Sequence, residues 1–350
     1  MSASNSGTGQ APFDVGALAR WMHNQGLLDR AELTTRALTG GQSNPTFRLI
    51  SGAQQFVLRK KPPGPLLPSA HAVDREYKVI KALQGSDVPV PKVFAFCDDD
   101  SVVGTPFFLM EFLDGRVMVD QSLPGMSPLE RRAIYEEMNR VIAALHKVDP
   151  AAVGLADFGR AGNYFGRQIA RWSRQYQETR TEEIPALDAL IEWLPAHIPP
   201  GDQTTIVHGD YRLDNLVFHP SEPRALGLLD WELSTLGHPL ADFAYHCMSW
   251  HIPATLWRGI GGLDLKALGI PTEREYIDLY SRATGLDGFE HWDFYIAYNL
   301  FRMAAILQGI ARRAVDGTAA SADAIETGSK ARPLAEIGWK YAQRYDASKK

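Results

Sequence analysis

The sequence has few cysteines, no long apolar run and no excess of positive charge. Its two cysteines, Cys97 and Cys247, lie far apart among 350 residues, which excludes a disulfide framework and indicates reduced, buried thiols. No run approaches the roughly 18 apolar residues of a membrane span, and residues 1–10 lack the apolar core of a signal peptide. With a net charge of −5 and no basic stripe, the chain lacks the electrostatic footprint of a nucleic-acid-binding protein. We therefore expect a cytoplasmic globular protein with neither membrane nor nucleic acid as a partner.

Length and composition predict two lobes. A chain of 350 residues that is 45% hydrophobic and 22% charged can bury a large core divided between two domains. We expect a disordered polar tail over residues 1–10, a small β-rich lobe over 11–113 and a larger, mainly helical lobe over 114–350. The predicted fold class is α+β.

Alternating apolar and polar residues predict a five-stranded sheet in the first lobe. The first two strands are joined by a loop that contains Gly40, Gly41, Ser43 and Asn44. Because glycine lets the backbone approach a ligand closely, such a loop can lie over phosphate groups, although most Gly-Gly turns are only turns. The expected strands are residues 33–38, 46–50, 55–60, 92–96 and 106–112, with helices over 13–28 and 72–83.

The most informative motif begins at His208. His208-Gly209-Asp210 is followed by Asn215, and Asp230 lies at the end of a later apolar strand. Protein kinases carry His-Arg-Asp, then an Asn after four intervening residues, then the Asp of Asp-Phe-Gly, in this order. The motif therefore predicts ATP-dependent phosphoryl transfer, with Asp210 taking the proton of the acceptor hydroxyl. We expect His208 to hold the backbone through hydrogen bonds.

The residues that follow predict a hairpin that brings Asn215 and Asp230 together. Two short apolar runs, 216–218 and 225–229, flank a turn-rich connector. Antiparallel pairing places the start of the first strand beside the end of the second, so the side-chain oxygens of Asn215 and Asp230 can face one magnesium ion. Glu232 either adds a carboxylate to the metal or caps the strand end.

The strand end near residue 60 offers three cations that could hold ATP phosphates. Residues two apart share a face of a strand, so Val57, Arg59 and Lys61 point one way and Lys60 points the other. If Val57 lines the adenine pocket, Arg59 is the phosphate-binding cation and Glu76 is its partner. The alternative is a solvated basic strand end.

Polar residues of the second lobe have open assignments. Arg212 either neutralises charge on the transferred phosphate or pairs with Asp214. Asp242 is expected to cap an apolar helix, and His146 to pack against the catalytic loop. A capping box at Ser127 predicts the start of another helix. Helical patterns also cover residues 162–197, 276–314 and 333–345.

Taken together, these motifs resemble the aminoglycoside phosphotransferase family, which includes choline kinase-like proteins. The resemblance covers about residues 30–310, and the run 207–215 is most similar to the kinase-like domains associated with acyl-CoA dehydrogenases. It implies a bilobal protein-kinase-like fold that binds ATP and Mg²⁺. It is carried by residues 40–44, 73–76, 207–215, 230–232 and 239–242.

The resemblance also implies roles for individual residues. Asp210 is the expected base, and Asn215 and Asp230 are the expected metal ligands. Many relatives have Lys at the position of Arg59, so this residue departs from the family pattern. The expected ATP site consists of Gly41, Ser43, Asn44, Val57, Arg59, Glu76, and the backbone near Glu111 and Leu113.

The acceptor pocket is expected among the late helices. The stretch 291–313 holds one Asp against Arg302, Arg312 and Arg313, which favours a neutral or anionic hydroxylated acceptor over a polycationic aminoglycoside. A hydroxyacyl compound or its CoA thioester is consistent with the relatives that the core motif resembles. The candidate contacts, each of which could instead be a packed core residue, are Trp250, His251, Tyr295, Asn299 and Arg302.

Two other functions compete with a kinase. A non-catalytic nucleotide-binding module is disfavoured because Asp210, Asn215 and Asp230 are all present. A metal-dependent hydrolase would have no use for the glycine loop, Arg59 and Glu76 in kinase order. The side chains that could form its dinuclear site are His208, Asp210, Asp230, His238, Asp242 and His246.

Overall fold

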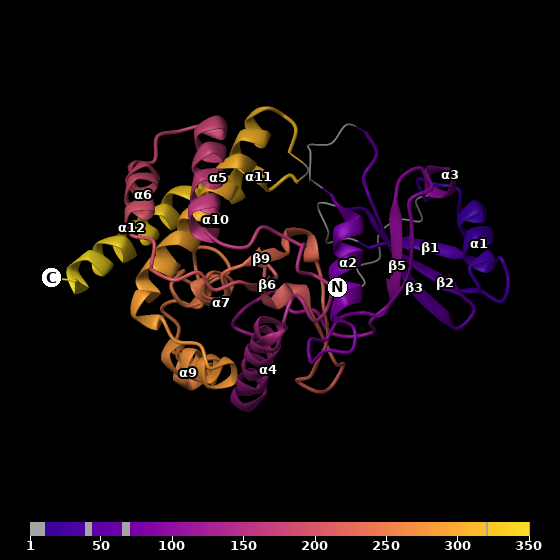
Figure 1. Ribbon diagram of the computed structural model, residues 1–350, viewed down its shortest axis with the longest axis horizontal. Helices are drawn as coiled ribbons and strands as arrows, with labels where there is room; N and C mark the ends of the chain where they lie inside the picture. Colours follow the sequence, from indigo (N-terminus) through magenta and orange to yellow (C-terminus); the bar gives the residue numbers. More distant parts are fainter. Residues whose placement is uncertain (1–10, 39–43, 65–70, 320, 350) are drawn as a thin grey trace. The chain divides into compact units, whose positions relative to one another are not determined.

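A computed structural model describes residues 11–38, 44–64, 71–319 and 321–349. The chain divides into two compact units (Figure 1). The first comprises Met1–Val119, Val153–Leu155 and Leu213–Ser234, and the second comprises Asp120–Ala152, Ala156–Arg212 and Thr235–Lys350. The lobe boundary expected after residue 113 stays a prediction, as does the tail over residues 1–10, which lies outside the described residues.

The first unit is built on an antiparallel sheet with the strand order β1-β2-β3-β5-β4. Each strand lies within one or two residues of its expected position, because alternation of apolar and polar residues defines a strand with one face on a core. The strands are β1 (Thr34–Ala37), β2 (Thr46–Ser51), β3 (Gln54–Lys60), β4 (Val93–Cys97) and β5 (Phe107–Glu111).

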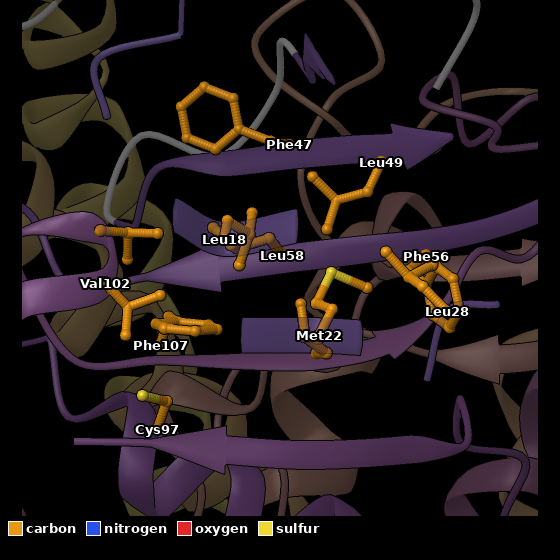
Figure 2. Close-up of a cluster of buried hydrophobic side chains, with 12 residues drawn as sticks. Leu18, Met22, Leu28, Phe47, Leu49, Phe56, Leu58, Cys97, Val102 and Phe107 are labelled. Carbon is orange, nitrogen blue, oxygen red and sulfur yellow. The ribbon is translucent and has the colours of Figure 1, made fainter. Parts of the chain in front are cut away.

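The two faces of this sheet have different partners. Leu58 and its alternate neighbours bury one face against α1 (Val15–Asn24) and the short helix α3 (Asp100–Val103), as Figure 2 shows. The other face carries α2 (Val73–Leu83), whose Tyr77 ring lies 6.1 Å from the Phe108 ring. Val57 and Arg59 belong to this second face because they alternate with Leu58.

A hairpin of β7 (Leu216–Phe218) and β8 (Ala225–Leu228) also belongs to the first unit and confirms the expected pairing. Phe218 and Arg116 exchange two backbone hydrogen bonds of 2.8 Å. Gly227 has no room for a side chain, since a Cβ there would lie 2.3 Å from Leu113 Cδ1. The hairpin is therefore fixed against the segment that follows β5.

The second unit is mainly helical. A short pair of strands, β6 (Thr205–Val207) and β9 (Thr235–Gly237), precedes α7. The long helix α10 is buried over most of its length and packs against α5, α7, α11 and α12. The helices are α4 (Pro128–Lys147), α5 (Tyr164–Thr179), α6 (Pro185–Ala196), α7 (Pro239–Cys247), α8 (Leu265–Leu268), α9 (Glu273–Thr284), α10 (Trp292–Val315), α11 (Ala324–Ser329) and α12 (Ala331–Ser348).

Glycine and capping residues define several helix ends. Ser127 and Glu130 form the expected capping box at the start of α4. The stretch 276–314 is not one helix, because α9 ends where Gly285 adopts φ 71°, a conformation that suits glycine. Within the described residues, none of the helices combines the length and the apolarity needed to cross a membrane.

Candidate active site

Arg59 lies between two carboxylates of the first unit. Its Nε is 2.7 Å from Glu76 Oε2, and its Nη2 donates a hydrogen bond of 2.5 Å to Asp230 Oδ1. Asn44 Nδ2 donates to the other Glu76 oxygen at 2.6 Å. The side chains of Arg59 and Glu76 are 9% and 1% exposed, whereas that of Asp230 is 30% exposed. Asp230 is thus the member of this group that solvent or a ligand can reach.

Burial dominates the electrostatics of this group. It raises the pKa of the Glu76 carboxyl to about 7, although the Arg59 charge acts in the opposite direction. Burial alone would lower the pKa of Arg59, but the charges of Glu76, Asp230 and Glu232 raise it above its ordinary value. The Arg59 guanidinium therefore remains a cation.

Lys60 points to the opposite face of the sheet, as the alternation predicts. Its Nζ donates to the Val103 carbonyl at 2.6 Å, and burial lowers its pKa. Of these two neighbouring cations, Arg59 is the one that pairs with Glu76. The geometry of the Arg59–Glu76 pair is as expected, and its role toward ATP stays a prediction.

Asp230 has an uncommon backbone conformation. Its φ and ψ are 65° and 61°, in the left-handed region, which costs a non-glycine residue about 1–2 kcal/mol. Trp231 is buried, and its indole nitrogen donates to the Leu228 carbonyl at 2.9 Å, which anchors the turn. The Leu229 amide donates to the Asn215 carbonyl at 2.8 Å. The hairpin therefore sets Asn215 and Asp230 at its two adjacent ends, and strain of this kind is typical of functional sites.

In the second unit, hydrogen bonds fix the loop at His208. The Asp242 carboxylate accepts from the amides of His208 and Gly209 at 2.7 and 2.8 Å. His208 Nδ1 accepts from the Asp210 amide at 3.2 Å, the backbone-holding role expected of it. Gly209 has φ 82°, a conformation that explains glycine where protein kinases carry arginine. The side chains of Asp242 and His208 therefore hold the loop through its backbone amides.

The expectation that Asp242 caps a helix is wrong. The cap of α7 is His238, whose ring nitrogen accepts from the Leu240 amide at 3.2 Å. Burial would raise the pKa of Asp242, but the His146 ring and the His208 amide lower it below its ordinary value. His146 lies 3.2 Å from Asp242 and so packs behind the loop, as expected. These buried donors stabilise the ionised form of the Asp242 carboxylate.

The Asp210 carboxylate is bound on both of its oxygens. Arg212 donates from Nε to Oδ1 at 2.8 Å and from Nη2 to Oδ2 at 3.0 Å. Tyr245 donates its hydroxyl to Oδ1 at 2.5 Å. Neither partner was predicted from the sequence. The available signal was that Tyr245 follows Asp242 by three residues and so shares its helix face.

Three acceptor candidates are buried and bonded inside the second unit. The Trp250 indole donates to the Pro271 carbonyl at 2.9 Å, and Asn299 Nδ2 donates to the Ala241 carbonyl at 2.9 Å. Tyr295 is 3% exposed. These contacts favour a packing role for each residue, and acceptor binding by them stays a prediction.

The arginines of α10 do not all line one site. Arg302 is buried, and its Nη2 donates to the Gly209 carbonyl at 2.7 Å. Arg312 pairs with Asp316 at 3.0 Å on the surface. Of these two, Arg302 is the one that contacts the loop at residue 209.

The histidines proposed for a dinuclear metal site have other partners. His246 Nε2 lies 2.8 Å from the Tyr276 hydroxyl, and His238 caps α7. Burial lowers the pKa of His238 to about 4 and that of His246 to about 3. In the part of the chain that the structure describes, no group of three or more His, Cys, Asp or Glu side chains is arranged to hold a metal ion.

The sheet unit and the helical unit together define a protein-kinase-like fold, and comparisons with known proteins agree. The model of the phosphotransferase enzyme family matches residues 34–298, so the chain belongs to that family. The resemblance drawn from the sequence motifs is thus confirmed.

Two solved structures illustrate the shared fold. A Ralstonia eutropha protein provisionally named an aminoglycoside phosphotransferase is 56% identical, with a TM-score of 0.87 over 95% of this chain and 99% of that chain. A thermostable mutant of the aminoglycoside phosphotransferase APH(4)-Ia, in a ternary complex with AMP-PNP and hygromycin B, has a TM-score of 0.62 over 93% of this chain and 98% of that chain. At 14% identity, the second likeness shows the fold alone.

The curated relatives are longer proteins. Acyl-CoA dehydrogenase family member 10 of Mus musculus is 48% identical over 306 residues, which are 87% of this chain and 29% of that protein. Family member 11 of Rattus norvegicus is 42% identical over 342 residues, which are 96% of this chain and 44% of that protein. The chain spans less than half the length of these relatives.

Proposed function

We propose that the chain is a small-molecule kinase that transfers the γ-phosphoryl group of ATP to a hydroxyl. The observation that carries the proposal is the Arg59 guanidinium between Glu76 and Asp230. Buried ion pairs contribute little net stability because desolvation offsets their attraction. Kinases nevertheless keep a cation, fixed by a helix carboxylate, to hold phosphates. Membership of the phosphotransferase family supports this reading of the buried charges.

The first unit would bind the nucleotide. Arg59 would contact the phosphates, and Val57, buried on the same face, would line the adenine pocket. The backbone near Glu111 and Leu113, at the end of β5, would bond the adenine ring. Asn44 would support Glu76. The loop residues Gly41 and Ser43, which lie outside the described residues, would approach the phosphates.

Asn215 and Asp230 would hold a magnesium ion. Their side chains supply an amide oxygen and a carboxylate, the hard donors that magnesium prefers, and the hairpin sets them at adjacent ends. The partial exposure of Asp230 suits a ligand that arrives with ATP. A bound magnesium ion would neutralise charge on the phosphates. Glu232, whose charge raises the Arg59 pKa, is a candidate for a further carboxylate.

Asp210 would act as the base. It would accept the proton of the acceptor hydroxyl, and Arg212, which pairs with it, would neutralise charge on the transferred group.

A neutral or anionic acceptor fits this site better than a polycation. Arg212 binds Asp210, and Arg302 binds the neighbouring Gly209, so an aminoglycoside would bring its positive charges toward two guanidinium groups. The curated relatives are named for acyl-CoA dehydrogenases. We therefore propose a hydroxyacyl compound or its CoA thioester as the acceptor.

The base assignment is tested by ADP release from magnesium ATP. Asp210→Asn should lower turnover by about 10²–10⁴-fold and leave ATP affinity unchanged. Asp188→Asn, which alters a partly exposed carboxylate of α6, is the matched control and should match the wild type in both. Unchanged turnover of Asp210→Asn would refute the role. A transition metal retained tightly by purified protein would favour the hydrolase instead.

A further inference from the structure

Three side chains of the second unit bind consecutive groups of the loop at residues 208–210. Asp242 accepts from the Gly209 amide, and Arg302 donates to the Gly209 carbonyl. Tyr245 donates its hydroxyl to the side chain of Asp210. Asp242 and Tyr245 lie three residues apart on α7 and thus on one face of that helix. One helix therefore fixes both the loop backbone and the carboxylate that the loop presents.

Tyr245 is held in a way that makes it a donor. Its side chain is 5% exposed, and the Arg302 guanidinium carbon lies 4.9 Å from the centre of its ring. A guanidinium over an aromatic face is attracted by the ring quadrupole, which keeps the ring in place. Burial raises the pKa of Tyr245 well above its ordinary value. The phenol therefore keeps its proton and cannot replace Asp210 as a base.

The two oxygens of Asp210 have different surroundings. Oδ1 accepts from Tyr245 at 2.5 Å and from Arg212 Nε at 2.8 Å, and Oδ2 accepts from Arg212 Nη2 at 3.0 Å. A long arginine side chain can turn toward a phosphate. The tyrosine ring is packed under Arg302 and stays where it is. Tyr245 is thus the partner that can define the orientation of the carboxylate throughout a reaction.

We propose that Tyr245 is a positioning residue, whose hydroxyl fixes Asp210 through Oδ1 so that Oδ2 meets the acceptor hydroxyl. This proposal rests on the proposed role of Asp210 as the base. The acceptor O–H proton passes to Oδ2 while the acceptor oxygen bonds the γ-phosphorus. The bond from that phosphorus to the bridging oxygen breaks, and its electron pair leaves with ADP. Tyr245 keeps its own proton at every stage.

The test compares two tyrosine variants that each lose one buried hydroxyl. Tyr245→Phe removes the bond to Asp210. Tyr135→Phe, the matched control, removes a bond of 2.7 Å to the Gln121 carbonyl in the same unit. ADP release from magnesium ATP, with water as the acceptor, gives kcat and KM for ATP as functions of pH.

We expect Tyr245→Phe to lower kcat by about tenfold, the usual effect of one hydrogen bond to a charged group, with no change in KM. The acid limb of its pH profile should move to higher pH, because the carboxylate loses a donor that stabilises its charged form. The other groups that face Asp210, namely Arg212, Arg302 and the His208 ring, are retained. Tyr135→Phe should keep the wild-type kcat and profile.

The outcomes separate this proposal from the proposed function. If Asp210→Asn is inactive while Tyr245→Phe keeps the wild-type kcat and acid limb, the positioning role fails and the base assignment stands. The positioning role is also overturned if kcat falls equally in Tyr135→Phe. It is overturned as well if the kcat and the ATP affinity of Tyr245→Phe fall together while the acid limb does not move, since loss of packing would then explain the effect. Turnover that persists in Asp210→Asn overturns the base assignment itself.

Discussion

Arg59 is the central residue of the buried ion pairs of the first unit. It alternates with Leu58, so the β-strand period turns it away from the apolar cluster and toward Glu76 of α2. Glu76 and Asp230 together neutralise it in a buried setting. An unpaired buried cation would be strongly destabilising, so Arg59 is tolerated in this buried position because the two carboxylates are beside it.

Arg59→Ala should weaken binding of a non-hydrolysable ATP analogue by about ten- to a hundredfold, because it removes charge-assisted hydrogen bonds to phosphate. Isothermal titration calorimetry in the presence of magnesium measures this directly. Arg59→Lys keeps the charge opposite Glu76 and should lose less affinity. Lys61→Ala, which alters the residue directly after the same strand, is the control. Unaltered affinity of Arg59→Ala together with a loss in Lys61→Ala would transfer the role to Lys61.

At this scale the sequence predicts partners that follow from a regular period and misses those that do not. The Arg59–Glu76 pair follows from strand alternation and helix position. Tyr245 and Arg212 reach Asp210 through the conformation of a loop whose Gly209 has a positive φ, and no periodicity encodes that geometry. Asp242 was assigned to its own helix because its partners, the amides of residues 208 and 209, are more than 30 positions away.

The helix α7 is the element of the second unit that carries several of its buried polar side chains. Its nine residues are all buried, and they include the carboxylate of Asp242 and the rings of Tyr245 and His246. Burial lowers the pKa of His246 to about 3 and that of His238, at the cap, to about 4. Both histidines are neutral in the folded protein and bind protons on unfolding below pH 6.5.

The unfolding free energy of the second unit should therefore fall as the pH falls from about 6.5 toward 4. The contribution of each histidine is complete above its unfolded pKa and is lost as the pH approaches its folded pKa. Between pH 6.5 and 5, the unfolding free energy of His246→Gln should fall by about 2 kcal/mol less than that of the wild type. Urea unfolding at the two pH values measures this difference.

His23→Gln, which removes the exposed histidine of α1, provides the control with which the pH slope of His246→Gln is compared. An identical slope in His246→Gln would mean that His246 does not remain neutral in the folded protein.

Elements were predictable where their boundaries carry local signals. The strands of the sheet, the hairpin around Asn215 and Asp230, and the capping box of α4 all lie where turn and cap residues indicate. The helix α3 was not predicted because its four residues are too few for a periodic pattern. The break between α9 and α10 depends on Gly285 and Gly288, which adopt positive φ values, within a stretch whose apolar pattern continues across it.

Across the whole chain, the family and the fold class were predictable because the phosphotransferase motifs have fixed order and spacing. The grouping of residues 213–234 with the sheet unit was not predictable, since those residues directly follow a loop of the second unit in sequence. Their attachment depends on contacts such as Phe218 with Arg116 and Gly227 with Leu113. The acceptor was the least predictable feature, because the candidate residues on the late helices are buried, as core residues also are, so their pattern in the sequence does not distinguish the two roles.

The central claim is transfer of phosphate from ATP to a hydroxyl group, and the most direct measurement follows radiolabelled γ-phosphate into a panel of hydroxylated metabolites. The panel contains hydroxyacyl-CoA thioesters, free hydroxy acids and an aminoglycoside, with and without magnesium. We predict a labelled phosphate ester of a neutral or anionic compound that requires magnesium and is lost in Asp210→Asn. Label appearing only as inorganic phosphate, or a labelled product that Asp210→Asn still forms, would contradict the account.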